Sequence, residues 1–283
     1  MLTLREVIRR SEAYLAQHGV DSPRLSAQLM AARGLGISRL DLFLQLDRML
    51  DDQDLGGVRE LVARRATGEP AAYILGAREF YGLDFEVNPS VLIPRPETEH
   101  AVEAVLERID AKAAVTFADL GVGSGALAVT LAVHLPESKG LAVDASDRAV
   151  ETALSNARRH GVDHRLAFAR ADFDRLPAPE RSLDLAVSNP PYIREADYPG
   201  LSPEVRKFEP RLALVSGPTG LEAFESAVRS MACALKPGGL AVLEIGFDQG
   251  PQAGSILASH GFQDVQILKD LAGCNRIVVG HAS

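Results

Sequence analysis

The sequence predicts an α/β protein in which a doubly wound, mostly parallel sheet follows a small all-helical domain. Three observations lead to this prediction. From about residue 96 onward, apolar strand-like segments alternate with helical ones. A glycine-rich loop, residues 121–125, follows the first of these strands and opens a helix. Residues 1–75 show helical periodicity alone, and a hairpin-like linker, residues 76–95, separates the two parts, so that the sheet domain spans residues 96–283.

The composition is that of a globular protein, with 46% apolar and 24% charged residues. No run approaches the ~18–20 apolar residues of a membrane span, and residues 1–10 are charged and periodic rather than signal-like. The two cysteines, Cys233 and Cys274, are widely spaced and argue against a disulfide framework or a zinc site. We therefore expect a cytoplasmic protein with no metal and no membrane contact.

The net charge of −8 bears on the class of partner. The charges of residues 1–80 cancel, so the acidic excess falls on the rest of the chain. A protein that binds duplex nucleic acid usually presents a basic face. The balance argues mildly against a nucleic-acid substrate, although a local basic groove is compatible with it.

The first 75 residues divide into four expected helices. Thr3-Leu4-Arg5-Glu6 fits a capping box at the start of the first helix. Asp21-Ser22-Pro23 offers an N-cap and an initial proline for the second, and Ser38 can cap the third. The fourth spans roughly residues 54–66 and is stopped by a Thr-Gly pair. This pattern predicts a helical bundle with no obvious chemistry of its own.

The rest of the chain alternates strand and helix. The expected strands are apolar, as they are when helices cover both faces of a parallel sheet. They lie at residues 115–120, 141–144, 166–171, 183–188 and 240–245. Two further strands, residues 264–268 and 276–279, are joined by a loop too short for a parallel crossover, so they must be antiparallel. The sheet is therefore expected to carry one antiparallel edge strand.

The loop Gly121-Val122-Gly123-Ser124-Gly125 indicates a nucleotide-like cofactor. Its glycines allow a tight turn and a close approach of the backbone to a ligand. Asp144 ends the next strand, where a carboxylate can accept both hydroxyls of a ribose. Taken alone, the loop fits an NAD-type dinucleotide as well as it fits S-adenosylmethionine. Glycines that merely allow helix–sheet packing are a third interpretation.

A second motif, Ser188-Asn189-Pro190-Pro191-Tyr192, ends the fourth strand. Two consecutive prolines cannot continue a strand, because neither has an N–H to donate. The Asn189 side-chain oxygen and a proline carbonyl can both accept hydrogen bonds from a planar –NH2 group. Tyr192 can lie against the flat group that carries it. A turn-forming Asn and a core tyrosine are the plainer interpretation.

Asp172 and Phe173 end the third strand, where a carboxylate can bind an adenine amine and a ring can stack on the base. An exposed Asp beside a core Phe is the alternative. Two further features point to the same cofactor. The antiparallel last strand is unusual in dehydrogenases, and Asn189 lies beside the switch point of the sheet. Together these features favour S-adenosylmethionine over NAD.

On these residues the chain resembles the S-adenosylmethionine-dependent methyltransferases, and more narrowly the peptide chain release factor glutamine methyltransferases, the HemK family. The similarity covers nearly the whole chain and is specific. Beyond residues 189–192 it includes Gly68-Glu69-Pro70, Arg95-Pro96-Glu97-Thr98-Glu99, Phe208-Glu209-Pro210, Glu244-Ile245-Gly246 and Asp270-Leu271-Ala272-Gly273. The chain departs from the family at Val122, often Thr, at Phe173, commonly Trp, and at Cys274-Asn275. None of these changes touches residues 189–192.

The resemblance implies a Rossmann-like class I methyltransferase sheet with an antiparallel last strand. It implies methyl transfer from S-adenosylmethionine, leaving S-adenosylhomocysteine, to the side-chain nitrogen of the Gly-Gly-Gln glutamine in class I peptide chain release factors. The implied catalytic residues are Asn189, Pro190 and Tyr192. The implied cofactor-binding residues are Gly121, Val122, Gly123, Ser124, Gly125, Asp144, Asp172, Phe173 and Asn189. The implied substrate-binding residues are Asn189, Pro190, Pro191, Tyr192, Arg95, Glu97 and Glu99.

Alternatives stay open at this point. For Arg95, Glu97 and Glu99, helix capping and helix-dipole charge explain the sequence equally well. The rival activities are an adenine-N6 methyltransferase acting on nucleic acid, a glutamine methyltransferase acting on a ribosomal protein, a non-catalytic S-adenosylmethionine-binding module and an NAD-linked oxidoreductase. We expect a monomer whose helical domain holds the release factor, with no direct contact to nucleic acid.

Overall fold

The computed structural model describes residues 2–283, which form two compact units. The first unit contains the chain up to Ala77 together with Ser202–Phe208. The second contains Arg78–Leu201 and Glu209–Ser283. The hairpin that we expected as a separate linker thus groups with the second unit, and a short segment far along the chain groups with the first.

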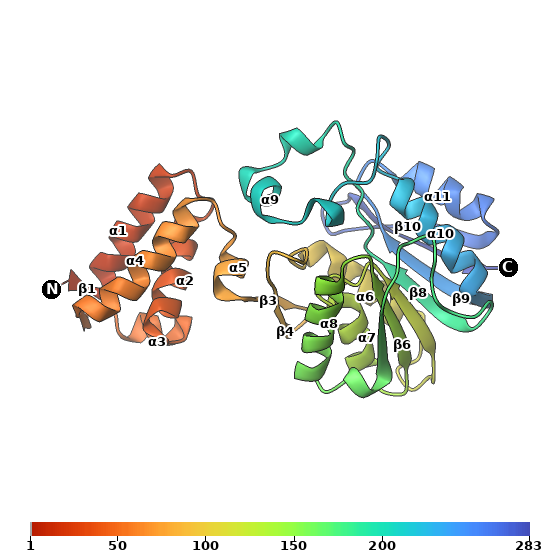
Figure 1. The fold of residues 1–283 in the computed structure, drawn as a ribbon, viewed down its shortest axis with the longest axis horizontal. Coiled ribbons are helices and arrows are strands. Elements are labelled where there is room, and N and C mark those ends of the chain that lie inside the picture. Colours follow the sequence, from red (N-terminus) through yellow and green to blue (C-terminus); the bar gives the residue numbers. More distant parts are fainter. Residues whose placement is uncertain (1) are drawn as a thin grey trace. The chain divides into compact units, whose positions relative to one another are not determined.

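The first unit is built mainly of helices (Figure 1). Its elements are β1 (Leu2–Thr3), α1 (Leu4–Gln17), α2 (Pro23–Leu35), α3 (Arg39–Leu44), β2 (Met49–Leu50), α4 (Asp52–Ala66), α5 (Ala71–Leu75) and α9 (Pro203–Phe208). The predicted capping box is present: the Thr3 side chain accepts from the Glu6 N–H, and the Glu6 carboxylate accepts from the Thr3 N–H at 2.9 Å. Ser22, in contrast, makes no side-chain capping bond and has a φ of 49°. None of the helices in residues 2–283 is both long and apolar enough to cross a membrane.

A buried arginine ties Ser202–Phe208 to this unit. The Arg65 side chain is 4% exposed and pairs with Glu204 of α9 at 2.8 Å. It also donates to the Glu69 carbonyl at 2.9 Å and to Ser26 Oγ at 3.4 Å. A guanidinium has five donors and is costly to bury unless it is paired. The sequence separation of 139 residues between Arg65 and Glu204 explains why the helical periodicity of residues 1–75 gave no sign of this partner.

The second unit holds a seven-stranded sheet with the strand order β10-β11-β9-β8-β5-β6-β7. Its strands are β5 (Thr116–Leu120), β6 (Lys139–Asp144), β7 (Leu166–Arg170), β8 (Leu183–Ser188), β9 (Leu235–Glu244), β10 (Phe262–Lys269) and β11 (Asn275–Ala282). Its helices are η1 (Pro96–Thr98), α6 (Glu99–Leu106), α7 (Ala126–His134), α8 (Asp147–Arg159), η2 (Asp163–Arg165), η3 (Tyr198–Gly200), η4 (Arg211–Ala213), α10 (Glu222–Ala234) and α11 (Gly250–Ser259). The predicted α/β class is confirmed.

The last strand is antiparallel, as predicted, but it is not at the edge of the sheet. β11 pairs with β9 on one side and with β10 on the other, antiparallel in both cases. The edge strand on this side is β10, in which buried or half-buried apolar residues are interspersed with exposed polar ones. Ile277, Val278 and Val279 of β11 are all buried, so the strand suits an interior position. The predicted hairpin is present, but the antiparallel strand lies second from the edge rather than at it.

Helices cover both faces of the sheet, and each face has its own core (Figure 1). Alternate residues of one strand enter opposite cores, as strand geometry requires. Thus Phe117 packs with α6, α7 and α8, whereas its neighbour Ala118 packs with α10 and α11. This double covering leaves the ends of the parallel strands as the open part of the sheet.

The hairpin β3 (Ala77–Phe80) and β4 (Leu83–Glu86) contributes to one of these cores. Its two-residue turn has positive φ at both Tyr81 and Gly82, the geometry that suits the twist of a tight hairpin. Phe80 and Phe85 are almost fully buried and meet edge to face, with ring centres 6.0 Å apart. The hairpin is therefore packed structure rather than a loose connection.

We predict that Gly140→Ala destabilises the protein. A Cβ at Gly140 of β6 would lie 2.5 Å from the Phe117 ring and 2.6 Å from Leu166 Cδ2, so the core must shift to admit it. Overpacking of this kind costs about 1–3 kcal/mol. Urea denaturation measures the loss. The matched control is Gly254→Ala on α11, where the nearest atoms lie at 3.7 and 3.8 Å; equal stability of the two variants would contradict the prediction.

Candidate active site

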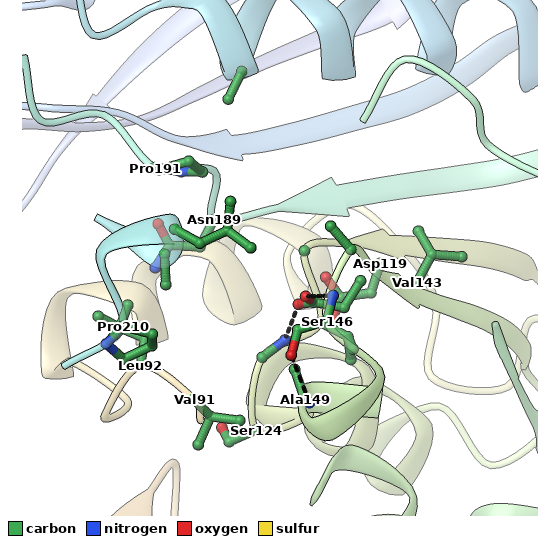
Figure 2. A pocket seen from close by; sticks show the side chains of 18 of the residues that line it. Val91, Leu92, Asp119, Ser124, Val143, Ser146, Ala149, Asn189, Pro191 and Pro210 are labelled. Carbon is green, nitrogen blue, oxygen red and sulfur yellow. Dashed lines mark hydrogen bonds between the residues drawn. The ribbon is translucent and has the colours of Figure 1, made fainter. Parts of the chain in front are cut away.

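A cavity of about 270 Å³ lies where β5, β6, β7 and β8 end. Parallel strands present their carboxyl ends at one edge of a sheet, and α/β proteins bind ligands there. Figure 2 shows Asn189 and Pro191 on one side of the cavity, Asp119 and Ser146 on another, and Leu92 and Pro210 on a third. All of its lining residues belong to the second unit.

The glycine loop forms part of the cavity wall. Gly121, Gly123 and Gly125 have φ values of 79°, 53° and 86°, a region that other residues adopt only with strain. A Cβ at Gly121 would lie 2.9 Å from the Phe173 ring, so only glycine lets that ring approach the loop. Gly125 does not line the cavity; a Cβ there would lie only 3.2 Å from Ala153 of α8, so glycine allows that helix to pack closely. The loop therefore serves both the cavity and helix packing.

Acidic and aromatic side chains at the next two strand ends also line the cavity. Asp144 accepts from the Gly123 N–H at 3.0 Å and from the Ser146 N–H at 2.9 Å, which fixes its carboxylate against the loop. Burial raises the pKa of Asp144, although these backbone donors oppose the rise. Asp172 accepts from the Phe173 N–H at 2.7 Å, and Ser230 holds the Phe173 carbonyl at 2.6 Å. The predicted neighbours Asp144, Asp172 and Phe173 thus share one cavity.

Asp119 is a buried carboxylate with an unused oxygen. Its Oδ2 accepts from the Ala128 N–H at 3.0 Å, but its Oδ1 has no hydrogen-bond partner among residues 2–283. The residue is 1% exposed and lines the cavity. Burial raises its pKa to about 7. An unsatisfied buried acceptor is costly, and a ligand N–H would satisfy it.

The segment after β8 turns sharply and lies beside the loop. Asn189 and Pro191 line the cavity; Pro190 and Tyr192 are not among its lining residues. Gln249 anchors the backbone by donating from Nε2 to the Tyr192 carbonyl at 3.1 Å. Ser188 Oγ donates to the Leu120 carbonyl at 2.6 Å, which joins the segment to the end of β5. These bonds hold the Asn189 side chain at the cavity wall.

A chain of hydrogen bonds runs from Asn189 into the protein. Asn189 Nδ2 donates to Thr98 Oγ1 at 3.1 Å, and Thr98 Oγ1 donates to Glu244 Oε2 at 2.6 Å. The Tyr192 hydroxyl lies near the same carboxylate, whose charge helps to raise the pKa of Tyr192. Burial raises the pKa of Glu244 to about 7 and raises that of Tyr192 as well. The Thr98 hydroxyl thus links the Asn189 amide to a buried carboxylate.

The predicted substrate residues Arg95, Glu97 and Glu99 do not line the cavity. Arg95 pairs at 2.5 Å with Glu209, whose side chain is 1% exposed and also accepts from the Ile93 N–H at 3.2 Å. Glu99 accepts from the Tyr81 N–H at 3.0 Å and so fastens the hairpin to α6. Glu97 is exposed. Arg95 and Glu99 thus bind other parts of the protein, and each is next in sequence to a lining residue, Pro94 and Thr98 respectively.

The sequence analysis missed Thr98, Asp119 and Glu244. Signals for two of them were present: Asp119 and Glu244 are carboxylates inside otherwise apolar strands, and a charged residue is almost never fully buried unless it has partners. Thr98 stood within the Arg-Pro-Glu-Thr-Glu run, where the charged residues were chosen instead. Of that run, Thr98 is the residue that lines the cavity.

The cavity combines a glycine-rich wall with side-chain oxygens that are free to accept hydrogen bonds. Asn189 Oδ1 has no hydrogen-bond partner among the described residues, whereas the amide nitrogen donates to Thr98. Asp119 Oδ1 is likewise free to accept. These two free acceptors suit a ligand with amine and hydroxyl groups, and the Phe173 ring beside Gly121 suits a flat base. Both features fit S-adenosylmethionine.

Comparison with known proteins gives two family matches. Residues 6–76 match the PrmC N-terminal domain, and residues 93–199 match the methyltransferase small domain. Among solved structures, a methyltransferase from Pyrococcus furiosus is similar with a TM-score of 0.51 and 17% identity, covering 77% of this chain and 96% of that one. At this identity the likeness concerns the fold, and it agrees with the predicted methyltransferase sheet.

Full-length relatives are more similar. A release factor glutamine methyltransferase of Nitratidesulfovibrio vulgaris is 48% identical, covering 98% of this chain and 94% of the relative. Proteins of the same name from Geobacter sulfurreducens and Moorella thermoacetica are 42% and 41% identical. They cover 98% and 99% of this chain, and 96% and 99% of their own length.

Proposed function

The chain belongs to the release factor glutamine methyltransferases, and on that premise we propose that it methylates the side-chain nitrogen of the Gly-Gly-Gln glutamine in class I peptide chain release factors. The observation that carries the proposal is the Asn189 amide at the cavity wall. Its nitrogen donates to Thr98, so its oxygen remains to accept an N–H from a substrate amide.

The methyl donor in this proposal is S-adenosylmethionine, whose sulfonium supplies an electrophilic methyl group. Asp144 would accept the ribose hydroxyls, and Phe173 with Asp172 would bind the adenine. Gly121 and Gly123 would let the backbone approach the ligand. The free Asp119 Oδ1 would accept from the amino group of the methionine part. A cationic group there favours the ionised carboxylate and opposes the burial effect on its pKa.

Orientation is the main task of the protein in the transfer. The lone pair of an amide nitrogen is delocalised into its carbonyl, so the nitrogen is a poor nucleophile. Asn189 Oδ1 and the Pro190 carbonyl would each accept one N–H and hold the nitrogen with one face toward the methyl group. Positioning of reactants can supply about 7–11 kcal/mol of the barrier.

The reaction needs no strong base. Once methylated, the amide nitrogen is a strong acid and loses its proton readily to water. No histidine occurs among the cavity-lining residues of the described chain, and we assign none a catalytic role. Tyr192 would pack against the flat substrate amide and exclude water from it.

The proposed partner is the release factor, held by the helical unit. Its exposed apolar side chains include Leu40, Phe43 and Leu44 of α3, which suit contact with a protein better than contact with a phosphate backbone. A cytoplasmic monomer without nucleic-acid contacts completes the proposal.

We predict that Gly121→Ala weakens the binding of S-adenosylmethionine by at least about tenfold, which corresponds to about 1.4 kcal/mol. The new Cβ would push against the Phe173 ring at 2.9 Å and displace it from the adenine position. Titration calorimetry measures the affinity. The matched control is Gly161→Ala, which has a similar φ of 70° but no atom within 4 Å of the added Cβ. Equal affinity of the two variants would remove the proposed role of Phe173.

We predict that Asn189→Ala lowers methyl transfer to a purified class I release factor by about 100- to 1,000-fold, the usual effect of removing one aligned hydrogen-bonding group. Transfer of labelled methyl from S-adenosylmethionine measures the rate. Asn275→Ala, the same change at a residue that does not line the cavity, should leave the rate unchanged.

The substrates in that assay test the proposed function itself. Label should enter the wild-type release factor and not a release factor whose Gly-Gly-Gln glutamine is alanine. Equal labelling of the alanine substrate would mean another target residue. Labelling of DNA would favour the nucleic-acid alternative and would contradict the proposal.

A further inference from the structure

Glu244 is a carboxylate at the end of β9, the strand next to β8 in the sheet. It is 1% exposed, and the strand around it is apolar. Among the residues described, it forms no salt bridge within 4.0 Å. Arg276 of the neighbouring strand β11 pairs with Asp270 instead, at 2.9 Å. Burying a carboxylate without an ion pair costs free energy. Its role in the site must therefore lie in the hydrogen bonds that it accepts.

The Thr98 hydroxyl meets this carboxylate. Thr98 of η1 donates to Glu244 Oε2 at 2.6 Å. The two residues come from separate parts of the chain, 146 residues apart. The Tyr192 hydroxyl lies near the same carboxylate, as the effect of each group on the other's pKa indicates. The buried carboxylate therefore fixes a side chain of η1.

The count of hydrogens at Thr98 determines the direction of Asn189. A threonine hydroxyl has one hydrogen, and Thr98 gives it to Glu244. Toward Asn189 the Thr98 oxygen can then only accept, so the amide must present Nδ2, which it does at 3.1 Å. In the reverse orientation the amide oxygen would face a lone pair. Oδ1 is thereby turned away from Thr98 and left to accept from a ligand.

We propose that Glu244 and Thr98 are positioning residues that set the orientation of the Asn189 amide. The catalytic consequence rests on the proposed function, because it assumes that Asn189 Oδ1 accepts an N–H of the substrate. The orientation itself follows from the hydrogen bonds alone and can be tested without a substrate.

Thr98→Val tests the hydrogen-bond relay, by which we mean the two bonds that connect Glu244 through Thr98 to Asn189. Valine has nearly the same shape but no hydroxyl, so the Asn189 amide loses the hydrogen-bond acceptor that sets its orientation. We expect kcat for methylation of the release factor to fall by about 10- to 100-fold, as small misplacements of a reacting group do, with S-adenosylmethionine affinity nearly unchanged. Thr98→Ser, which restores the hydroxyl, should recover most of the rate. The matched control is Thr130→Val, at a fully buried threonine whose hydroxyl has no hydrogen-bond partner in the described structure.

A second readout separates this inference from the proposed substrate. In NMR spectra, the Asn189 side-chain NH2 signal is identified by its loss in Asn189→Ala. Its exchange with solvent should be slow in wild type, Thr98→Ser and Thr130→Val, and fast in Thr98→Val. If exchange does not respond to Thr98→Val, the inference is overturned, whatever the enzyme methylates. If exchange responds and the release factor is not methylated, the orientation stands and the proposed function fails.

We predict further that the relay depends on pH. The groups that act on the Glu244 carboxyl are Thr98, Tyr192 and Arg276, which favour its ionised form, and Glu97, which opposes it; burial dominates and raises the pKa to about 7. Above that pH the carboxylate accepts from Thr98. Below it, a protonated Glu244 can donate to Thr98 Oγ1, which frees the threonine hydrogen for Asn189 Oδ1 and favours the reversed amide.

The kcat of wild type should therefore rise as pH increases through about 7, where Glu244 becomes ionised. Glu244→Gln keeps an oxygen that can accept from Thr98 but cannot titrate, so its profile should lack this step. An unchanged step in Glu244→Gln would assign the titration to another group and would overturn the role of Glu244. Thr130→Val should retain the wild-type profile.

Discussion

Parallel pairing of β5, β6, β7 and β8 is the constraint on which the site depends. It brings the ends of these strands to one edge, so that residues far apart in sequence line one cavity. Each strand end supplies one function: the glycine loop after β5, Asp144 on β6, Phe173 after β7 and Asn189 after β8. β9 ends beside them and contributes Glu244, which is buried behind the wall.

Features that depend on neighbouring residues could be predicted from the sequence. The capping box needs only Thr3 and Glu6, and the glycine loop is recognised from its own five residues. Asn189 was identifiable because two prolines mark where a buried strand must end. In each case the physical cause lies within a few residues of the feature. The approximate positions of the strands and the antiparallel hairpin at the end of the chain followed in the same way, although β9 begins at Leu235, five residues before the predicted start.

Features that depend on distant pairing could not be predicted. The order of β10 and β11 depends on which arm β9 pairs with, and a loop of a few residues permits either. The role of Thr98 depends on Glu244 and on Asn189, which is 91 residues away. The same limit explains Arg95: its charge suggested a ligand contact, but its partner is Glu209, 114 residues away. Sequence patterns identify a polar group more readily than its partner.

Glu244 also shows how stability and orientation can oppose each other in one residue. Its folded-state pKa is raised from 4.5 to about 7, so the folded protein binds this proton more tightly than the unfolded chain does. The resulting stabilisation is complete below pH 4.5 and is lost as pH rises through about 7. The ionised form that orients Thr98 and Asn189 appears over that same upper range. An apolar residue of similar volume would avoid the free-energy cost of burying an ionised carboxylate, since such replacements are often neutral or stabilising. In our proposal the carboxylate is present because it sets the orientation of the Asn189 amide, which the cavity requires, and not because it stabilises the fold.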